Sequence, residues 1–146
     1  MKVETILIPI DFSAHSEKAL QTGIDLAKTF GARIGLVHCY PRPLPSVAPY
    51  GLDLPPGYVG ELRHSALAHT NEWAEKVRAS GVEAVVHVTS DPPVTGICEQ
   101  AEALSADLIV MGTQGLSGLK HVLLGSVAER TIRQAACPVL VVKVDS

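Results

Sequence analysis

The chain has 146 residues, the usual size of one domain, so we expect a single unit over residues 1–146. Hydrophobic residues make up 47% and charged residues 18%, which favours a packed aliphatic core and excludes a disordered chain. Twelve Lys and Arg stand against 15 Asp and Glu. The formal charge of -3 argues against sequence-independent binding of nucleic acid.

The cysteines and the apolar runs indicate where in the cell the protein is expected to be. Cys39, Cys98 and Cys137 lie far apart with no CxxC pair, so neither a disulfide framework nor a zinc site is indicated. The apolar stretch within Met1–Asp11 is too short for a signal peptide, and no apolar run reaches the roughly 18 residues that span a bilayer. We therefore expect a soluble, cytoplasmic protein without a membrane partner.

The first part of the chain alternates between strand and helix patterns. Short aliphatic runs at Thr5–Ile10 and Arg33–Cys39 predict buried strands. Between them, Ser16–Phe30 carries apolar residues at helical spacing, and Gly31 stands where a left-handed helix end is favourable. We interpret Pro9 as the end of the first strand, because proline removes a donor from the ladder.

A proline-rich segment, Tyr40–Gly60, interrupts this alternation. It contains Pro41, Pro43, Pro45, Pro49, Pro55 and Pro56. Prolines at this density exclude regular structure over most of the span. We interpret it as a long exposed loop of variable surface sequence, and a lid over a ligand is the alternative.

The alternation then resumes and continues to the end of the chain. A helix is expected at Glu61–Ser80, with Gly81 as its stop, and a strand at Val82–Thr89. A helix is then expected at Val94–Leu104, preceded by Asp91 as cap and Pro92 as first residue, and a strand at Asp107–Met111. A helix at Val127–Ala135 and a strand at Val139–Val144 follow. Strands and helices in this order predict a doubly wound, Rossmann-like α/β domain, with helices on both faces of a parallel sheet.

A glycine-bearing loop follows the fourth expected strand, and in such sheets ligands lie beyond the carboxyl ends of the strands. Gly112, Gly115 and Gly125 permit positive φ and close approach, and can turn successive amides toward one anion. Ser126 and Glu129 have capping-box spacing, so the last helix should present its positive end there. The loop has neither the Gly-Lys of a Walker loop nor a GxGxxG dinucleotide pattern.

Three stretches resemble the universal stress protein family: Ile6–Ser13, Gly112-x2-Gly115-x9-Gly125-Ser126 and Cys137–Val142. The likeness extends over essentially the whole chain. It implies a five-stranded parallel sheet of order 3-2-1-4-5. It also implies membership of the subgroup that binds ATP, because every position of the glycine motif is filled.

The resemblance implies three groups of nucleotide contacts. The adenosine would lie against Pro9, Asp11 and Cys39, with Met111 beside it. The ribose and α-phosphate would follow Gly112 and Gly115, and the outer phosphates would be held by Gly125, Ser126 and Val127. Cys39 stands where an aliphatic residue is usual, which keeps that contact apolar.

Several of these residues have plainer interpretations. Asp11 is also placed to cap the first helix, and two isolated glycines would be read as turn residues. We interpret Lys120 and His121 as solvated loop charges. No carboxylate pattern joins His38, His64 and His69, so we interpret them as ordinary surface or partly buried histidines rather than metal ligands.

The sequence thus predicts an ATP-binding module that regulates a stress response, with Mg²⁺ or Mn²⁺ bridging the phosphates. We expect binding rather than turnover, at most a slow ATPase, and assign no catalytic residue and no metal ligand, because no arginine finger or carboxylate pair accompanies the glycine loop. The alternative is a dimeric interaction module that binds AMP, cyclic AMP or no nucleotide. The apolar strand 138–144 is expected to form a homodimer.

Overall fold

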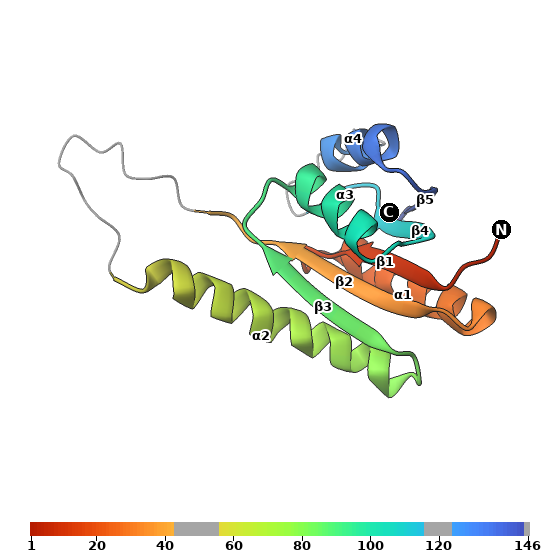
Figure 1. Cartoon of the computed structure of the whole chain (residues 1–146), viewed down its shortest axis with the longest axis horizontal. Helices are drawn as coiled ribbons and strands as arrows, with labels where there is room; N and C mark the ends of the chain where they lie inside the picture. Colours follow the sequence, from red (N-terminus) through yellow and green to blue (C-terminus); the bar gives the residue numbers. More distant parts are fainter. Residues whose placement is uncertain (43–55, 116–123, 145–146) are drawn as a thin grey trace.

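The structure is a computed structural model that describes residues 1–42, 56–115 and 124–144. Within these ranges a parallel sheet has the order β3-β2-β1-β4-β5, as expected (Figure 1). Its strands are β1 (Thr5–Pro9), β2 (Arg33–Cys39), β3 (Ala84–Thr89), β4 (Leu108–Gly112) and β5 (Val139–Val142). Pro9 closes β1, paired with Val37 of β2.

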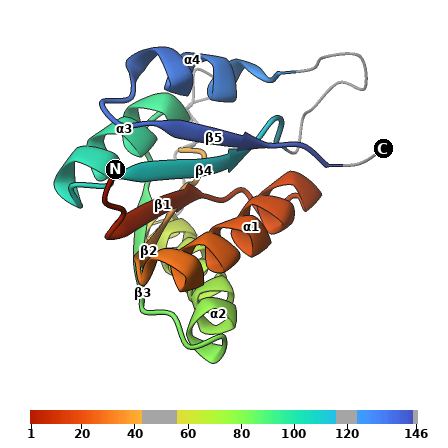
Figure 2. The ribbon, with the colours of Figure 1, turned by 90° about the vertical axis from the view of Figure 1, so that its right-hand side faces the viewer.

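Helices cover both faces of this sheet, as the alternating pattern predicted. They are α1 (Ala14–Phe30), α2 (Tyr58–Ala79), α3 (Pro93–Ala103) and α4 (Ser126–Gln134). Figure 2 shows α1 and α2 on one side of the sheet and α3 and α4 on the other. Two large hydrophobic clusters, one on each face, therefore form most of the core. A smaller cluster of Tyr40, Ala66 and Val88 lies between α2 and the sheet.

The middle of β1 is completely buried. Ile6, Leu7 and Ile8 are fully buried, because β1 lies between β2 and β4 and both of its faces are covered. Removing an aliphatic side chain of this size from water stabilises the fold by about 1.5–3 kcal/mol. These residues anchor the strand whose end reaches the candidate site.

Two helix ends follow the prediction. Gly31 terminates α1 in the left-handed conformation, with φ of 69°. Gly81 follows α2 with φ of 91°. α2 begins at Tyr58, three residues before the expected start. Residues 43–55 of the proline-rich segment lie outside the described ranges, and so do Lys120 and His121. The choice between loop and lid therefore stays a prediction.

The predicted start of α3 was wrong. Asp91 is not the cap of α3: the helix begins at Pro93, after Pro92. Because a residue before proline is kept out of the helical region, Pro92 is extended, with ψ of 143°, and the helix cannot start earlier.

The capping box of α4 is also absent. Gly125, not Ser126, occupies the cap position, and its amide donates to Thr113 O at 2.6 Å. Ser126 is therefore already the first helical residue. Glu129 instead pairs with Arg133 one turn later, at 2.8 Å.

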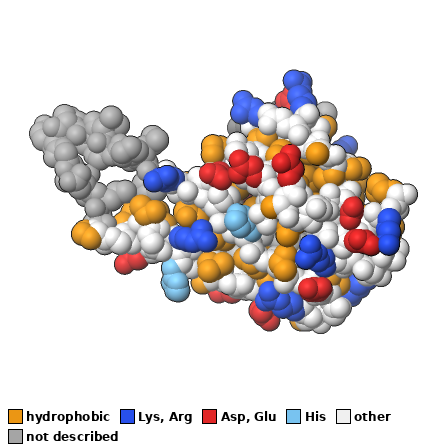
Figure 3. Space-filling view, in the orientation of Figure 1, with side chains coloured by type: hydrophobic (Ala, Val, Ile, Leu, Met, Phe, Trp, Pro, Cys, Tyr) orange, Lys and Arg blue, Asp and Glu red, His pale blue; other side chains and the backbone are white. Residues whose placement is uncertain are grey.

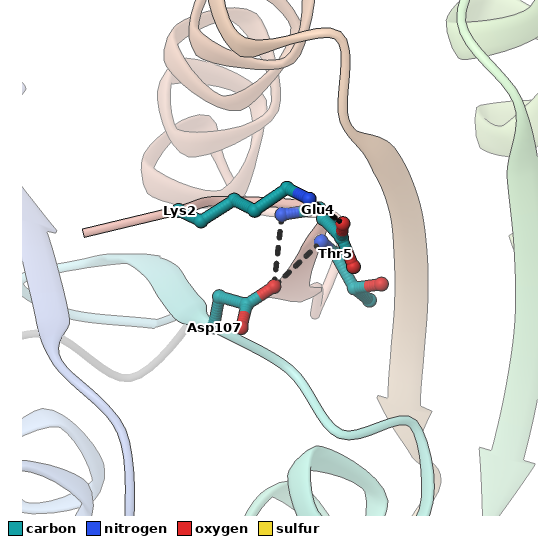
Figure 4. A network of polar contacts seen from close by, with 4 residues as sticks. All are labelled: Lys2, Glu4, Thr5 and Asp107. Carbon is teal, nitrogen blue, oxygen red and sulfur yellow. Dashed lines mark hydrogen bonds and ion pairs between the residues drawn. The ribbon is translucent and has the colours of Figure 1, made fainter.

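Asp107 joins the amino ends of β1 and β4 (Figure 4). Its Oδ2 accepts from the amides of Glu4 at 2.8 Å and Thr5 at 3.0 Å, and its own amide donates to Thr5 O. Lys2 forms an exposed ion pair with Glu4 beside this network. The end of the sheet opposite the candidate site is thus fixed by polar contacts.

On the face shown in Figure 3, positive, negative and hydrophobic side chains are interspersed, consistent with the weak net charge. Within the described ranges, none of the helices combines the length and the apolar character needed to cross a membrane.

Candidate functional site

A pocket of about 570 Å³ lies at the carboxyl ends of β1, β2 and β4. The strand order reverses between β1 and β4, which is where open parallel sheets receive ligands. β1 pairs with β4 only at Ile6↔Leu108 and Leu7↔Ile109, whereas it pairs with β2 along its whole length. The two strands therefore separate toward their carboxyl ends, which leaves room for the pocket.

All nine residues that the sequence placed at the site line this pocket. They are Pro9, Asp11, Cys39, Met111, Gly112, Gly115, Gly125, Ser126 and Val127. The wall also includes residues that the sequence reasoning missed: Ile10, Ser16, Val37, Pro93, Ile97, Thr113, Gln114 and Ala128. Most of these neighbour a predicted position or belong to α3, whose approach to β2 no local pattern reveals. The role of the nine residues in nucleotide binding stays a prediction.

Cys39 contributes to the apolar part of the pocket. Its thiol donates a weak hydrogen bond to Pro93 O at 3.8 Å, which joins the end of β2 to the start of α3. Burial, with a smaller contribution from Asp91, raises the pKa of Cys39 to about 11. The side chain is therefore a neutral thiol at pH 7 and offers an apolar surface.

Asp11 follows β1 and faces the pocket from the start of α1. Its Oδ1 accepts from Ser16 Oγ at 2.6 Å and from the Ser13 amide at 3.1 Å. The Asp11 amide in turn donates to Ser16 Oγ at 2.8 Å. Ser13, not Asp11, is the cap of α1, because Ser13 Oγ accepts from the Ser16 amide. Asp11 is thus held at the helix start while it lines the pocket.

Gly112 and Gly115 are needed for close approach. A Cβ at Gly115 would collide with the Asp11 carboxylate, and one at Gly112 would lie 2.7 Å from His15 Cβ. Neither glycine has positive φ, so that part of the expectation was wrong. Side chains at these two positions would displace α1 or fill the space beside Asp11.

The start of α4 closes the other side of the pocket. Gly125 lies against Thr113, and a Cβ there would be 3.0 Å from Thr113 O. No side chain of the cap residue covers the first turn of α4, and Ser126 and Val127 of that turn line the pocket. Amides of a first helical turn lack acceptors within the helix and carry partial positive charge, an arrangement suited to an anion.

His38 supports the β1 end from outside the pocket. Its Nδ1 donates to Ile10 O at 2.8 Å, since a carbonyl can only accept. Burial lowers the pKa of His38, although this hydrogen bond and the Asp11 charge oppose the shift.

The backbone of Phe12, two residues after Ile10, is strained. Its φ is 67°, a conformation that costs a bulky residue on the order of 1–3 kcal/mol.

No cluster of three or more His, Cys, Asp or Glu suited to a metal ion occurs within residues 1–42, 56–115 and 124–144. Among the described pocket residues only Asp11 and Cys39 ionise, and Cys39 is neutral at pH 7. The described part of the pocket thus presents backbone amides, the Gln114 side-chain amide and one carboxylate beside an apolar surface, together with three hydroxyl groups, those of Ser16, Thr113 and Ser126. Its chemistry is suited to holding a ligand with a flat apolar end and an anionic end.

The fold and the pocket together define a doubly wound α/β protein with a ligand site at the switch point of its sheet. A sequence profile of the Universal stress protein family matches residues 2–143, and the chain belongs to this family. It is similar to Universal stress protein MJ0531 of Methanocaldococcus jannaschii, with 40% identity over 143 residues, which cover 94% of this chain and 81% of that protein.

Two solved structures share the fold. Hypothetical protein MJ0577 superposes with a TM-score of 0.85 and 27% identity, covering 100% of this chain and 99% of its own. A universal stress protein in complex with cAMP superposes with a TM-score of 0.68 and 24% identity, covering 98% of each chain.

Proposed function

We propose that this protein binds ATP in the switch-point pocket and acts as a nucleotide-dependent regulatory module in a stress response. The observation that carries the proposal is the convergence of residues from β1, β2, β4 and α4 on one pocket, with an apolar part beside a helix start. A universal stress protein of the same fold has been solved in complex with cAMP, which supports an adenine nucleotide as the ligand class.

The pocket suggests how the ligand would be oriented. The adenine would lie against Pro9, Cys39 and Met111, where the wall is apolar, and the ribose would lie near Asp11. The phosphates would then extend along the glycines toward the first turn of α4, whose amides favour negative charge. The volume of about 570 Å³ is within the usual range for a site of this kind.

We propose that a divalent cation, Mg²⁺ or Mn²⁺, accompanies the phosphates rather than residing in the protein. The donor set agrees with this, because Asp11 is the single carboxylate in the described wall and no group of metal-ligating side chains surrounds it. The same composition favours binding over rapid turnover, since no described side chain in the wall is positioned both to activate water and to neutralise a leaving phosphate.

Calorimetric titration of nucleotide-stripped protein with ATP and Mg²⁺ tests the proposal. We expect saturable binding that Gly115→Val abolishes, because the added side chain would collide with the Asp11 carboxylate. Gly60→Val is the matched control, since nothing lies within 4 Å of a Cβ at that exposed position of α2. No heat with wild-type protein at millimolar ATP would contradict the proposed function.

A second candidate is that the site holds an adenosine monophosphate or cyclic AMP, as in the structure solved with cAMP. Titrations with ATP, AMP and cyclic AMP at one pH and one salt concentration distinguish the two. Mass spectrometry of ligand released from the purified protein identifies the nucleotide that the protein binds in the cell. Tighter binding of a monophosphate than of ATP would favour this second candidate.

We also propose that the protein is a homodimer, formed when the strand 138–144 meets its copy, and that it works in the cytoplasm. Among the strands that the structure describes, β5 lies at the edge of the sheet next to β4, and Leu140 on it is 39% exposed. The three cysteines are free thiols, which fits a reducing compartment.

A further inference from the structure

A group of rings holds the turn between β1 and α1 from outside the pocket. We call Phe12, His38, His69 and Trp73 the Phe12 clamp. The Phe12 ring stacks on His69 of α2, with centroids 3.7 Å apart and planes 11° apart. It also contacts the His38 ring at 4.5 Å and the Trp73 ring at 5.4 Å. Side chains of β2 and α2 therefore converge on the residue that follows Asp11.

The backbone at Phe12 depends on these contacts. Its φ of 67° is a left-handed conformation that glycine adopts readily and a bulky aromatic residue adopts only when its surroundings hold it. This turn brings the Ser13 amide within 3.1 Å of Asp11 Oδ1, across Phe12. If the ring were released, Phe12 would favour negative φ and this hydrogen bond would be lost.

The same turn sets the position of the pocket carboxylate. Asp11 lies so close to Gly115 that a Cβ at residue 115 would collide with the carboxylate. A change in φ at Phe12 rotates the chain on either side of it, so the carboxylate cannot keep this place when the turn relaxes. Contacts of α2 are thereby coupled to a wall of the pocket.

We propose that Phe12 is a positioning residue and that His69 of α2, by stacking on it, holds Asp11 in the conformation that binds nucleotide. The effect on affinity rests on the proposed ATP site, whereas the effect on the turn does not. His69 is exposed, so its ring can be removed without opening a cavity in the core. If the His69 contact served only packing, its removal would change neither the turn nor the ligand affinity.

Charged groups adjoin the clamp. Lys76 lies over the Trp73 ring at 4.6 Å and is paired with Glu17 of α1 at 3.3 Å. These exposed contacts lie on the Trp73 side, whereas His69 stacks on Phe12 itself. Substitution of His69 therefore tests the stacked pair without removing either partner of the Lys76–Glu17 ion pair.

The test compares His69→Ala, His69→Phe and His64→Ala in the full chain. His64 is the matched control, since it is an exposed histidine of the same helix. We expect His69→Ala to weaken ATP binding about threefold to tenfold, the range that one aromatic contact supplies. His69→Phe should restore binding because it keeps a flat ring over Phe12, and His64→Ala should have no effect.

Hydrogen exchange of the Ser13 amide provides a readout that needs no nucleotide. We expect faster exchange in His69→Ala and recovery in His69→Phe. The unfolding midpoint should decrease slightly in His69→Ala, by no more than the loss of one aromatic contact, and recover in His69→Phe. Unchanged Ser13 exchange in folded His69→Ala would overturn the proposal, as would failure of His69→Phe to restore either measurement. If wild-type protein binds no adenine nucleotide, the proposed function fails, while the Ser13 amide still decides whether the clamp sets the turn.

Discussion

Cys39 fits beside the pocket because residue 96 is a glycine. A Cβ at Gly96 would lie 2.7 Å from Cys39 Sγ and 2.9 Å from Thr89 Cγ2, closer than side-chain atoms pack. Without that Cβ, α3 can approach the ends of β2 and β3 closely enough for Pro93 to reach the thiol. The apolar part of the pocket thus depends on a small residue one turn into the following helix.

His38 makes the stability of the fold depend on pH. Its pKa is lowered in the folded state, chiefly by burial, so the unfolded chain binds a proton first as pH falls below about 6.5. The contribution of neutral His38 is fully present above that pH and is lost progressively as pH falls toward the lowered pKa. We expect the urea midpoint to decrease from pH 7 to pH 5.

The variant His38→Asn isolates this contribution, since asparagine can keep a donor near Ile10 O but does not titrate. Its urea midpoint should change less over the same pH range than that of the wild-type protein. Parallel pH profiles for the two proteins would show that groups other than His38 cause the dependence.

At the scale of elements, local sequence patterns predicted where helices occur, but they predicted less accurately the residue at which each helix begins. Gly31 and Gly81 end helices as expected, because a glycine with positive φ is a local requirement. The start of α3 was missed by one residue because two consecutive prolines restrict each other. The start of α4 was missed because the Gly125 amide donates to Thr113 O, just after the end of β4. Tertiary contacts of this kind leave no periodic signal in the sequence.

Asp107 gives a prediction at this scale. Replacement by alanine removes the acceptor of the Glu4 and Thr5 amides, and we expect unfolding in urea to show a loss of about 1–3 kcal/mol. Asp107→Asn keeps one carbonyl oxygen and should lose less. ATP affinity should change little in either variant, because the network lies at the amino ends of the strands. Equal stability of Asp107→Ala and wild type would show that water replaces the carboxylate without cost.

At the scale of the whole molecule, the sheet order was predicted through the family resemblance. Nine of the residues that line the pocket were predicted, the glycines and Ser126 from the loop pattern and the others through the resemblance, whereas eight further lining residues were not. Alternating strand and helix patterns gave the parallel sheet, and carboxyl strand ends gave the location of the site. The sequence does not predict the Phe12 clamp, since it indicates only an ordinary surface or partly buried histidine at residue 69. Its contact with Phe12 depends on how α2 lies over the end of β1, which nothing near residue 69 specifies.

The proposed dimer is tested at the exposed edge of the sheet. Leu140→Asp places a charge on a side chain that is 39% exposed, so the monomer should fold while strand pairing with a copy is disfavoured. Light scattering at micromolar concentration should give the mass of two chains for the wild-type protein and of one chain for the variant. Gly60→Val again serves as a control far from β5 in the sequence. A wild-type protein that is monomeric at this concentration would contradict the proposal.

The three thiols affect how such a mass is interpreted. Burial raises the pKa of Cys98 and of Cys137 as well as that of Cys39, so all three are protonated at neutral pH. Because only the thiolate attacks another sulfur or an oxidant, covalent cross-linking in air should be slow. Two chains that travel together without reductant would accordingly be joined by noncovalent contacts.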